Sequence, residues 1–157
     1  MFAEKLDFYR TLVAQAQSLI ADEPDLIANM ANLSALLFNE MPDLNWSGFY
    51  ILRQGELVLG PFQGKPACVR IAVGKGVCGT AVATGEIQLV PDVHAFAGHI
   101  ACDAASNSEI VLPVRHQGNI IAVLDIDSPS LARFDAADQQ GLAELVRVFE
   151  LRLEQTL

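Results

Sequence analysis

Cys102 lies in a short polar stretch of the chain and not within an apolar run. Asp103, Ser106 and Asn107 follow it, and an apolar segment then begins at Glu109. A cysteine that only packs usually lies among apolar residues, because its thiol behaves there as a small hydrophobe. A thiol in polar surroundings is the kind that meets a substrate or an oxidant. This stretch therefore predicts a reactive thiol.

Two further cysteines, Cys68 and Cys78, lie upstream in other segments expected to be loops. Three cysteines without a CxxC pair make a poor framework for structural disulfides. In a reducing compartment, a disulfide among them would be transient and catalytic. The thiols, with acidic residues on nearby strands, suggest redox chemistry on a small polar substrate.

Three carboxylates are expected to meet at one end of a hairpin. Alternation along 119–127 places Asp125 and Asp127 on one strand face, and closure at Gln117-Gly118 brings Glu109 near Asp127. Neighbouring carboxylates repel unless a cation or a shared proton lies between them. The pattern fits either a solvated strand end or an acidic pocket with an ammonium as its guest.

Trp46, Gly48 and Tyr50 share one face of a predicted strand. Buried aromatics most often belong to the core. Trp46 and Tyr50 could equally wall a pocket against a small apolar or sulfur-bearing group.

Two other patterns predict no cofactor and no metal. The glycines of 74–79 match a dinucleotide fingerprint, but the following helix is short, so we expect a tight strand-to-helix turn. His94, His99 and Cys102 have spacings that match no compact zinc site. His99 is expected instead to lower the pKa of the Cys102 thiol.

The composition favours a folded domain that avoids polyanions. The chain has 157 residues, of which 52% are hydrophobic, and a formal charge of −9. The acidic balance excludes nucleic acid and disfavours an anionic membrane surface. With no signal peptide and no apolar run long enough to span a membrane, we expect one domain over residues 1–157 in the cytoplasm.

Hydrophobic periodicity predicts an α+β fold. We expect a second helix that begins near Pro24, capped by Asp22, and a polar loop over 91–108. The other expected elements are helices over 3–21, 76–84 and 135–156, and strands over 46–53, 56–62, 67–73, 87–90, 109–116 and 119–127. We expect a turn at Gln54-Gly55 between the first two strands, and Asp135 as the cap of the last helix. This order favours an antiparallel sheet with the N- and C-terminal helices on one face and a loop-covered pocket on the other.

Five short motifs together resemble one known family. They are 46–50 (WSGFY), 60–64 (GPFQG), 76–79 (GVCG), 99–103 (HIACD) and 124–128 (LDIDS). They resemble the free methionine-(R)-sulfoxide reductases, which are single GAF domains. The similarity spans nearly the whole chain, and the three cysteines occupy the family's cysteine positions.

The resemblance implies reduction of free L-methionine-(R)-sulfoxide. Cys102 would attack the sulfoxide sulfur and become a sulfenic acid as methionine leaves. Glu109 with Asp127 would protonate the sulfoxide oxygen, Asp125 would hold the ammonium, and Trp46 would cover the sulfur and methyl end. The division of roles among the three acids stays open at this point.

The resemblance also implies a disulfide that thioredoxin reduces. Cys68 is our choice for the thiol that resolves the sulfenic acid, with Cys78 as an auxiliary, although their roles could be reversed. Cys78 could even be the nucleophile, but its apolar setting predicts the most buried thiol and so favours Cys102. A bridge between Cys68 and Cys102 requires Cα atoms within ~7 Å.

Two other functions fit parts of this pattern. A GAF module could bind a small ligand and regulate a partner, because fold does not determine function. A peroxide-sensing thiol protein would use Cys102 and Cys68 without the acids. We also expect the first helix to be able to pair with a second copy, and the 91–108 loop to rearrange on oxidation.

Overall fold

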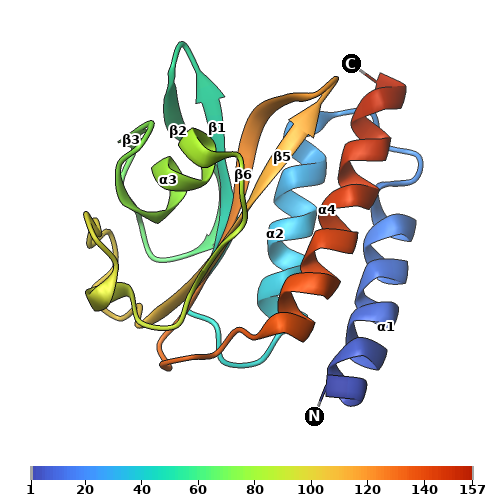
Figure 1. Cartoon of the computed structure of the whole chain (residues 1–157). Helices are drawn as coiled ribbons and strands as arrows, with labels where there is room; N and C mark the ends of the chain where they lie inside the picture. The colour runs from blue at the N-terminus through green and yellow to red at the C-terminus, as the bar shows by residue number, and fades with distance from the viewer. Residues whose placement is uncertain (1, 157) are drawn as a thin grey trace.

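The computed structural model describes residues 2–156, which form a six-stranded sheet with helices on both faces (Figure 1). All neighbouring strands are antiparallel, in the order β3-β2-β1-β6-β5-β4. The strands are β1 (Trp46–Arg53), β2 (Glu56–Gly64), β3 (Arg70–Ala72), β4 (Gln88–Val90), β5 (Ser108–His116) and β6 (Asn119–Ser128). The predicted α+β class and antiparallel sheet are confirmed.

The two faces of the sheet carry different layers. Helices α2 (Leu26–Glu40) and α4 (Ala136–Thr156) lie against one face, and α1 (Phe2–Ile20) packs beside them (Figure 1). The other face is covered by α3 (Gly76–Thr84), the short 3-10 helix η1 (Val93–Ala95) and loops. Each face has its own apolar cluster, because alternate residues of β1, β5 and β6 point to opposite sides. Within residues 2–156, no helix is both long and apolar enough to cross a membrane.

The two predicted hairpin turns are confirmed. Gln54 and Gly55 join β1 to β2, and Gln117 and Gly118 join β5 to β6. All four have positive φ, between 52° and 81°. Two successive residues with positive φ define the type I′ turn, whose twist matches that of a two-stranded ribbon. A register shift between Val114 and Arg115 then places Glu109 opposite Asp127, whereas the pairing that starts at the turn would place it opposite Ile126.

Some local expectations are wrong. Helix α2 is capped by Asp25, whose side chain accepts a hydrogen bond from the Ala28 N–H at 2.8 Å, and not by Asp22. Pro24 therefore precedes the helix, and the strand expected over 67–73 shortens to β3. Cys78 lies in the first turn of α3 and not in a loop.

Helix α4 contacts α1 closely at Gly141. A Cβ atom at this position would overlap the ring of Tyr9, so only glycine admits the observed approach. The Tyr9 hydroxyl donates a hydrogen bond to the buried Asp138 at 2.7 Å, and Lys5 also pairs with Asp138 at 2.7 Å. Asp135 caps α4 by accepting from the Ala137 N–H at 3.0 Å, as predicted.

Gly141→Ala is expected to lower the free energy of unfolding by about 1–3 kcal/mol, because overpacking displaces the Tyr9 ring. In a Tyr9→Ala background the same change should be neutral or stabilising, since alanine favours a helix over glycine. Thermal unfolding of the two single variants and the double variant gives the coupling. Equal effects in both backgrounds would contradict the close contact.

Candidate active site

Strand register places the predicted acids beside the predicted aromatics on the loop-covered face. Asp127 of β6 is paired with Trp46 of β1 on one side and with Glu109 of β5 on the other. Asp125, which precedes Asp127 by two positions on β6, is paired with Gly48 of β1 and with Val111 of β5. The period of two therefore brings Trp46 and all three carboxyls to one face. Of the two interpretations of the acidic residues, the acidic pocket is therefore correct and the solvated strand end is wrong.

These residues line one cavity between the sheet and the covering loops. Glu109, Asp125 and Asp127 are only 8%, 5% and 8% exposed. The sequence-predicted site residues that line the cavity are Trp46, Tyr50, Cys78, Cys102, Glu109, Asp125 and Asp127. The described lining contains no lysine and no arginine. A cation therefore suits this cavity better than an anion.

The remaining predicted residue, Cys68, reaches the site through a disulfide with Cys102. The two Cα atoms are 5.4 Å apart, within the range that the predicted bridge requires. The bond joins two loops separated by 34 residues, one before β3 and one before β5. Cys78 is the free thiol and, at 4% exposure, is buried as predicted.

Aromatic residues of β1 hold the Cys68 loop in place. The Tyr50 hydroxyl donates a hydrogen bond to the Cys68 carbonyl at 2.8 Å, and the Trp46 indole N–H donates to the Lys65 carbonyl at 3.2 Å. Trp46 also stacks on Phe62, with ring centroids 5.1 Å apart. The same side chains thus form a cavity wall and anchor the loop that carries one disulfide sulfur.

Asn45 is a site residue that the sequence analysis missed. Its side-chain amide donates hydrogen bonds to Asp103 and Ser106, each at 3.0 Å, and its backbone N–H donates to the Asp127 carbonyl at 3.0 Å. It therefore ties the Cys102 loop to the acidic end of β6. No local sequence signal marks this residue, since its two side-chain partners lie 58 and 61 positions away.

Burial raises the pKa of all three acids, and the charges of neighbouring acids add to the shift for Glu109 and Asp127. The pKa of Glu109 lies well above its usual range because of burial, the charges of Asp125 and Asp127, and hydrogen bonds to both. The pKa of Asp127 is also well raised, by burial and then by Asp125. The pKa of Asp125 is raised by burial, but hydrogen bonds from Glu109 and Cys78 oppose the shift. Asp125 is therefore the acid best placed to be ionised, and Glu109 the one best placed to hold a proton.

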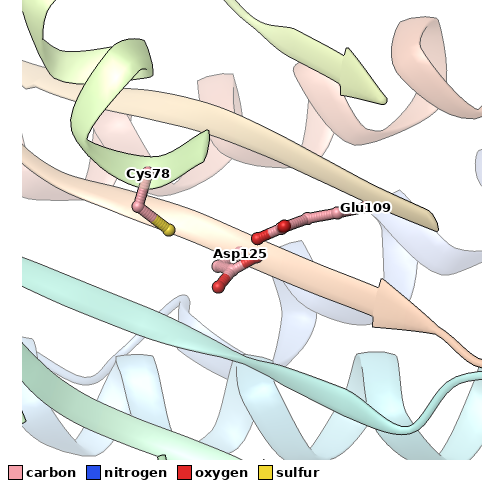
Figure 2. A group of neighbouring side chains, drawn as sticks. All are labelled: Cys78, Glu109 and Asp125. Atoms are coloured by element: carbon pink, nitrogen blue, oxygen red, sulfur yellow. The ribbon is translucent and has the colours of Figure 1, made fainter. Parts of the chain in front are cut away.

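Cys78 faces the acids from the first turn of α3. Figure 2 shows its sulfur directed toward the carboxyl groups of Glu109 and Asp125 on the strands below. Burial, followed by the charge of Asp125, raises the pKa of this thiol well above its usual value. A raised pKa makes a thiol a poor nucleophile, which supports the choice of Cys102 for attack.

The comparisons with known proteins agree with this geometry. The GAF domain family model matches residues 28–154. The chain is 56% identical to a free methionine-R-sulfoxide reductase of Escherichia coli K12, over 97% of this chain and 92% of the relative. It is 46% identical to the solved free methionine-R-sulfoxide reductase of Neisseria meningitidis in complex with its substrate, with a TM-score of 0.93 over 97% of this chain and 92% of that chain. The chain belongs to the free methionine-(R)-sulfoxide reductases, within the GAF domain family.

A second free methionine-R-sulfoxide reductase, from Saccharomyces cerevisiae, is 40% identical over 92% of this chain and 84% of the relative. The resemblance stated from the five motifs is therefore confirmed. The glycines of 74–79 form the tight strand-to-helix turn that the sequence predicts. Gly74 and Gly76 have positive φ, and a Cβ at Gly79 would overlap the Ala72 carbonyl, so they form the turn from β3 into α3.

In this free methionine-(R)-sulfoxide reductase, His99 and Cys102 line the same cavity. His99 lines the cavity, but burial and the nearby His94 lower its pKa, which favours the neutral imidazole. The two rings contact each other edge to face, with centroids 5.9 Å apart. His94 also pairs with Asn107 at 3.2 Å. The expected lowering of the Cys102 pKa by His99 stays a prediction.

Glu109→Gln is expected to raise the melting temperature of this reductase at neutral pH. The raised pKa keeps Glu109 protonated when folded, while the unfolded chain ionises it above about pH 4. The Glu109 carboxyl therefore lowers the free energy of unfolding of the wild type as pH rises. Glutamine does not ionise, so the variant does not lose this stability. The difference in melting temperature should grow from pH 4 to pH 7.

The exposed Glu86 provides the matched control, since Glu86→Gln should leave the melting temperature unchanged across the same range. A Glu109→Gln variant that is less stable than the wild type at every pH would show that Glu109 does not carry the inferred burial penalty.

Proposed function

We propose that this protein reduces free L-methionine-(R)-sulfoxide to L-methionine, with thioredoxin as the reductant. The observation that carries the proposal is the juxtaposition of Cys102, bonded to Cys68, with an acidic cavity whose described lining has no basic residue other than His99. The N. meningitidis relative was solved with its substrate, which supports the same kind of ligand here.

The reaction follows from the positions of the thiol and the acids. The Cys102 thiolate attacks the sulfoxide sulfur while a neutral carboxyl gives a proton to the sulfoxide oxygen. The sulfur–oxygen bond of the substrate breaks, the oxygen passes to Cys102 as a sulfenic acid, and methionine leaves. The Cys68 thiol then attacks the Cys102 sulfur, water leaves, and the disulfide forms. The substrate is reduced by two electrons, which come from the two thiols.

The acids divide their roles according to protonation. Glu109 and Asp127, with the more strongly raised pKa values, would supply the proton. Asp125, stabilised as a carboxylate by hydrogen bonds from Glu109 and Cys78, would bind the substrate ammonium. Trp46 and Tyr50 would pack against the sulfur-bearing end, since both line the cavity. This proposal keeps Cys78 as an auxiliary thiol in recycling.

The same cavity favours a free amino acid over a residue within a protein. A peptide bond would remove the ammonium and leave the buried acids without a cationic partner. The proposal has three further parts. The protein is a single domain over residues 1–157, it works in the cytoplasm, and two copies pair through the first helix. Apolar side chains of α1 favour such pairing, because Phe2 and Leu19 are 51% and 41% exposed.

Turnover is expected with free methionine-(R)-sulfoxide, and not with the (S) epimer or the N-acetylated (R) form. The assay follows NADPH consumption with thioredoxin and thioredoxin reductase. Cys102→Ser should abolish turnover, because no other thiol can replace the nucleophile. Turnover of the N-acetylated form would contradict the role of the ammonium, and activity in Cys102→Ser would contradict the choice of nucleophile.

Glu109→Gln is expected to slow sulfoxide reduction in a single turnover by about 10²–10⁴-fold, the usual contribution of a general acid. Asp125→Asn should mainly raise KM. In the wild type the rate should fall as pH rises through the raised pKa values of Glu109 and Asp127, since the proton is then lost. Stopped-flow methionine release across a pH series measures these effects. An unchanged rate of methionine release in Glu109→Gln would contradict the role of Glu109 as the proton donor.

A further inference from the structure

Cys78, Glu109 and Asp125 form a cluster whose chemistry extends beyond sulfoxide reduction. One possible ligand atom from each, the Cys78 sulfur and a carboxylate oxygen of the other two, lie within 4.8 Å of one another (Figure 2). All three residues are more than nine-tenths buried. In addition, the Asp125 carboxyl group interacts with Glu109 and Cys78, but its Oδ1 atom is buried and has no hydrogen-bond partner. A buried carboxylate oxygen without a partner is unfavourable, which points to a missing ligand.

We propose that this cluster binds a thiophilic divalent cation of the Zn²⁺ class, and that the bound cation blocks the substrate cavity. This cation is an inhibitory ligand and not a cofactor of the reaction. The inhibition rests on the proposed function, because the site coincides with the proposed ammonium position. The binding itself does not depend on any activity of the protein.

The donor set selects the kind of cation. One cysteine sulfur and two carboxylate oxygens match the ligands that Zn²⁺ accepts, with a fourth position left open to the cavity. Mg²⁺ and Ca²⁺ are excluded as preferred ligands, since both favour sets made only of oxygen. Cd²⁺ and Co²⁺ accept the same mixed set as Zn²⁺ and can serve as probes.

The cation also resolves the unfavourable electrostatics of the cluster. Burial and the acids keep Cys78 protonated in the free protein. A divalent cation reverses this balance, because a coordinated thiol loses its proton outright. The protons of the Cys78 thiol and of the Glu109 carboxyl pass to the solvent as both groups coordinate, and no oxidation or reduction takes place. Asp127 lies beside Glu109 in the register and adds a third carboxyl group to the same region.

The histidines form a separate group. His94 and His99 contact each other and lie on the covering segments, whereas Cys78 lies on α3 and the two acids lie on β5 and β6. Neither histidine belongs to the Cys78 cluster. A His94 variant can therefore serve as a matched control, because His94 offers a metal-binding side chain near the cavity loops without belonging to the proposed site.

The test titrates Co²⁺ into the oxidised protein without reductant. In this state Cys68 and Cys102 form the disulfide, so Cys78 is the one free thiol of the chain's three cysteines. A sulfur-to-cobalt charge-transfer band in the near ultraviolet must then come from Cys78. We expect one cobalt ion per chain by native mass spectrometry, and displacement of the band by Zn²⁺. His94→Ala should keep the band.

Cys78→Ser should lose the band, and Asp125→Asn should weaken Co²⁺ binding at least tenfold. Far-UV circular dichroism verifies that each variant is folded, and Asp125→Asn decides the matter if Cys78→Ser does not fold. No band in the wild type, a band that persists in Cys78→Ser, or unchanged binding in Asp125→Asn would overturn the proposal.

Activity assays separate this inference from the proposed function. If the metal-free protein reduces methionine sulfoxide, the apparent KM should rise linearly with the Zn²⁺ concentration from its zinc-free value, with an unchanged kcat. A purely kcat effect would contradict the overlap of the two sites. If the metal-free protein shows no turnover while the cobalt band is present, the proposed function fails and the cation site stands.

Discussion

Antiparallel pairing of β5 with β6 places Glu109 directly beside Asp127, and the alternation of β6 adds Asp125 to the same face. Three carboxyls buried at this spacing cannot all be charged, so the cluster must retain protons or receive a cation. Much of the cavity's chemistry follows from this constraint. The raised pKa values, the protonated Cys78 thiol and the absence of lysine and arginine from the described lining all make a guest cation favourable.

The opposite face of the sheet supplies stability that this arrangement requires. Apolar side chains from α1, α2 and α4 pack there with those of β1, β5 and β6 to form the larger apolar cluster. Burial of apolar surface contributes about 25 cal/mol per Å², so a well-packed layer can offset the unfavourable burial of a few carboxyls. The molecule thus keeps its stabilising layer and its chemical layer on separate sides of one sheet.

Short-range patterns predicted much of this architecture. Alternation in 119–127 identified which side chains of β6 face the cavity, and glycine-containing dipeptides located both hairpin turns. These features depend on neighbouring residues, which a sequence displays directly. The predicted cap of α2 was wrong because Asp22 and Asp25 both have side chains suited to capping. Only the path of the chain decides between them.

Long-range contacts were less accessible from the sequence. The bridge between Cys68 and Cys102 was anticipated through the family resemblance, since spacing alone left the pairing open. The hydrogen bonds of Asn45 to the Cys102 loop, and of Tyr50 to the Cys68 carbonyl, depend on how two loops fold over the sheet. No periodicity encodes such contacts, because each loop takes its shape from the surface beneath it.

The carboxyls lie on strands, whereas both disulfide sulfurs lie on loops that cross above them. In the proposed function, recognition and electron transfer are thus carried by parts of the chain that can diverge independently. Replacement of the two loop cysteines would leave the register of the acids intact and produce a receptor that holds its ligand without consuming it. The same framework therefore connects a catalyst and a sensor by changes confined to the loops.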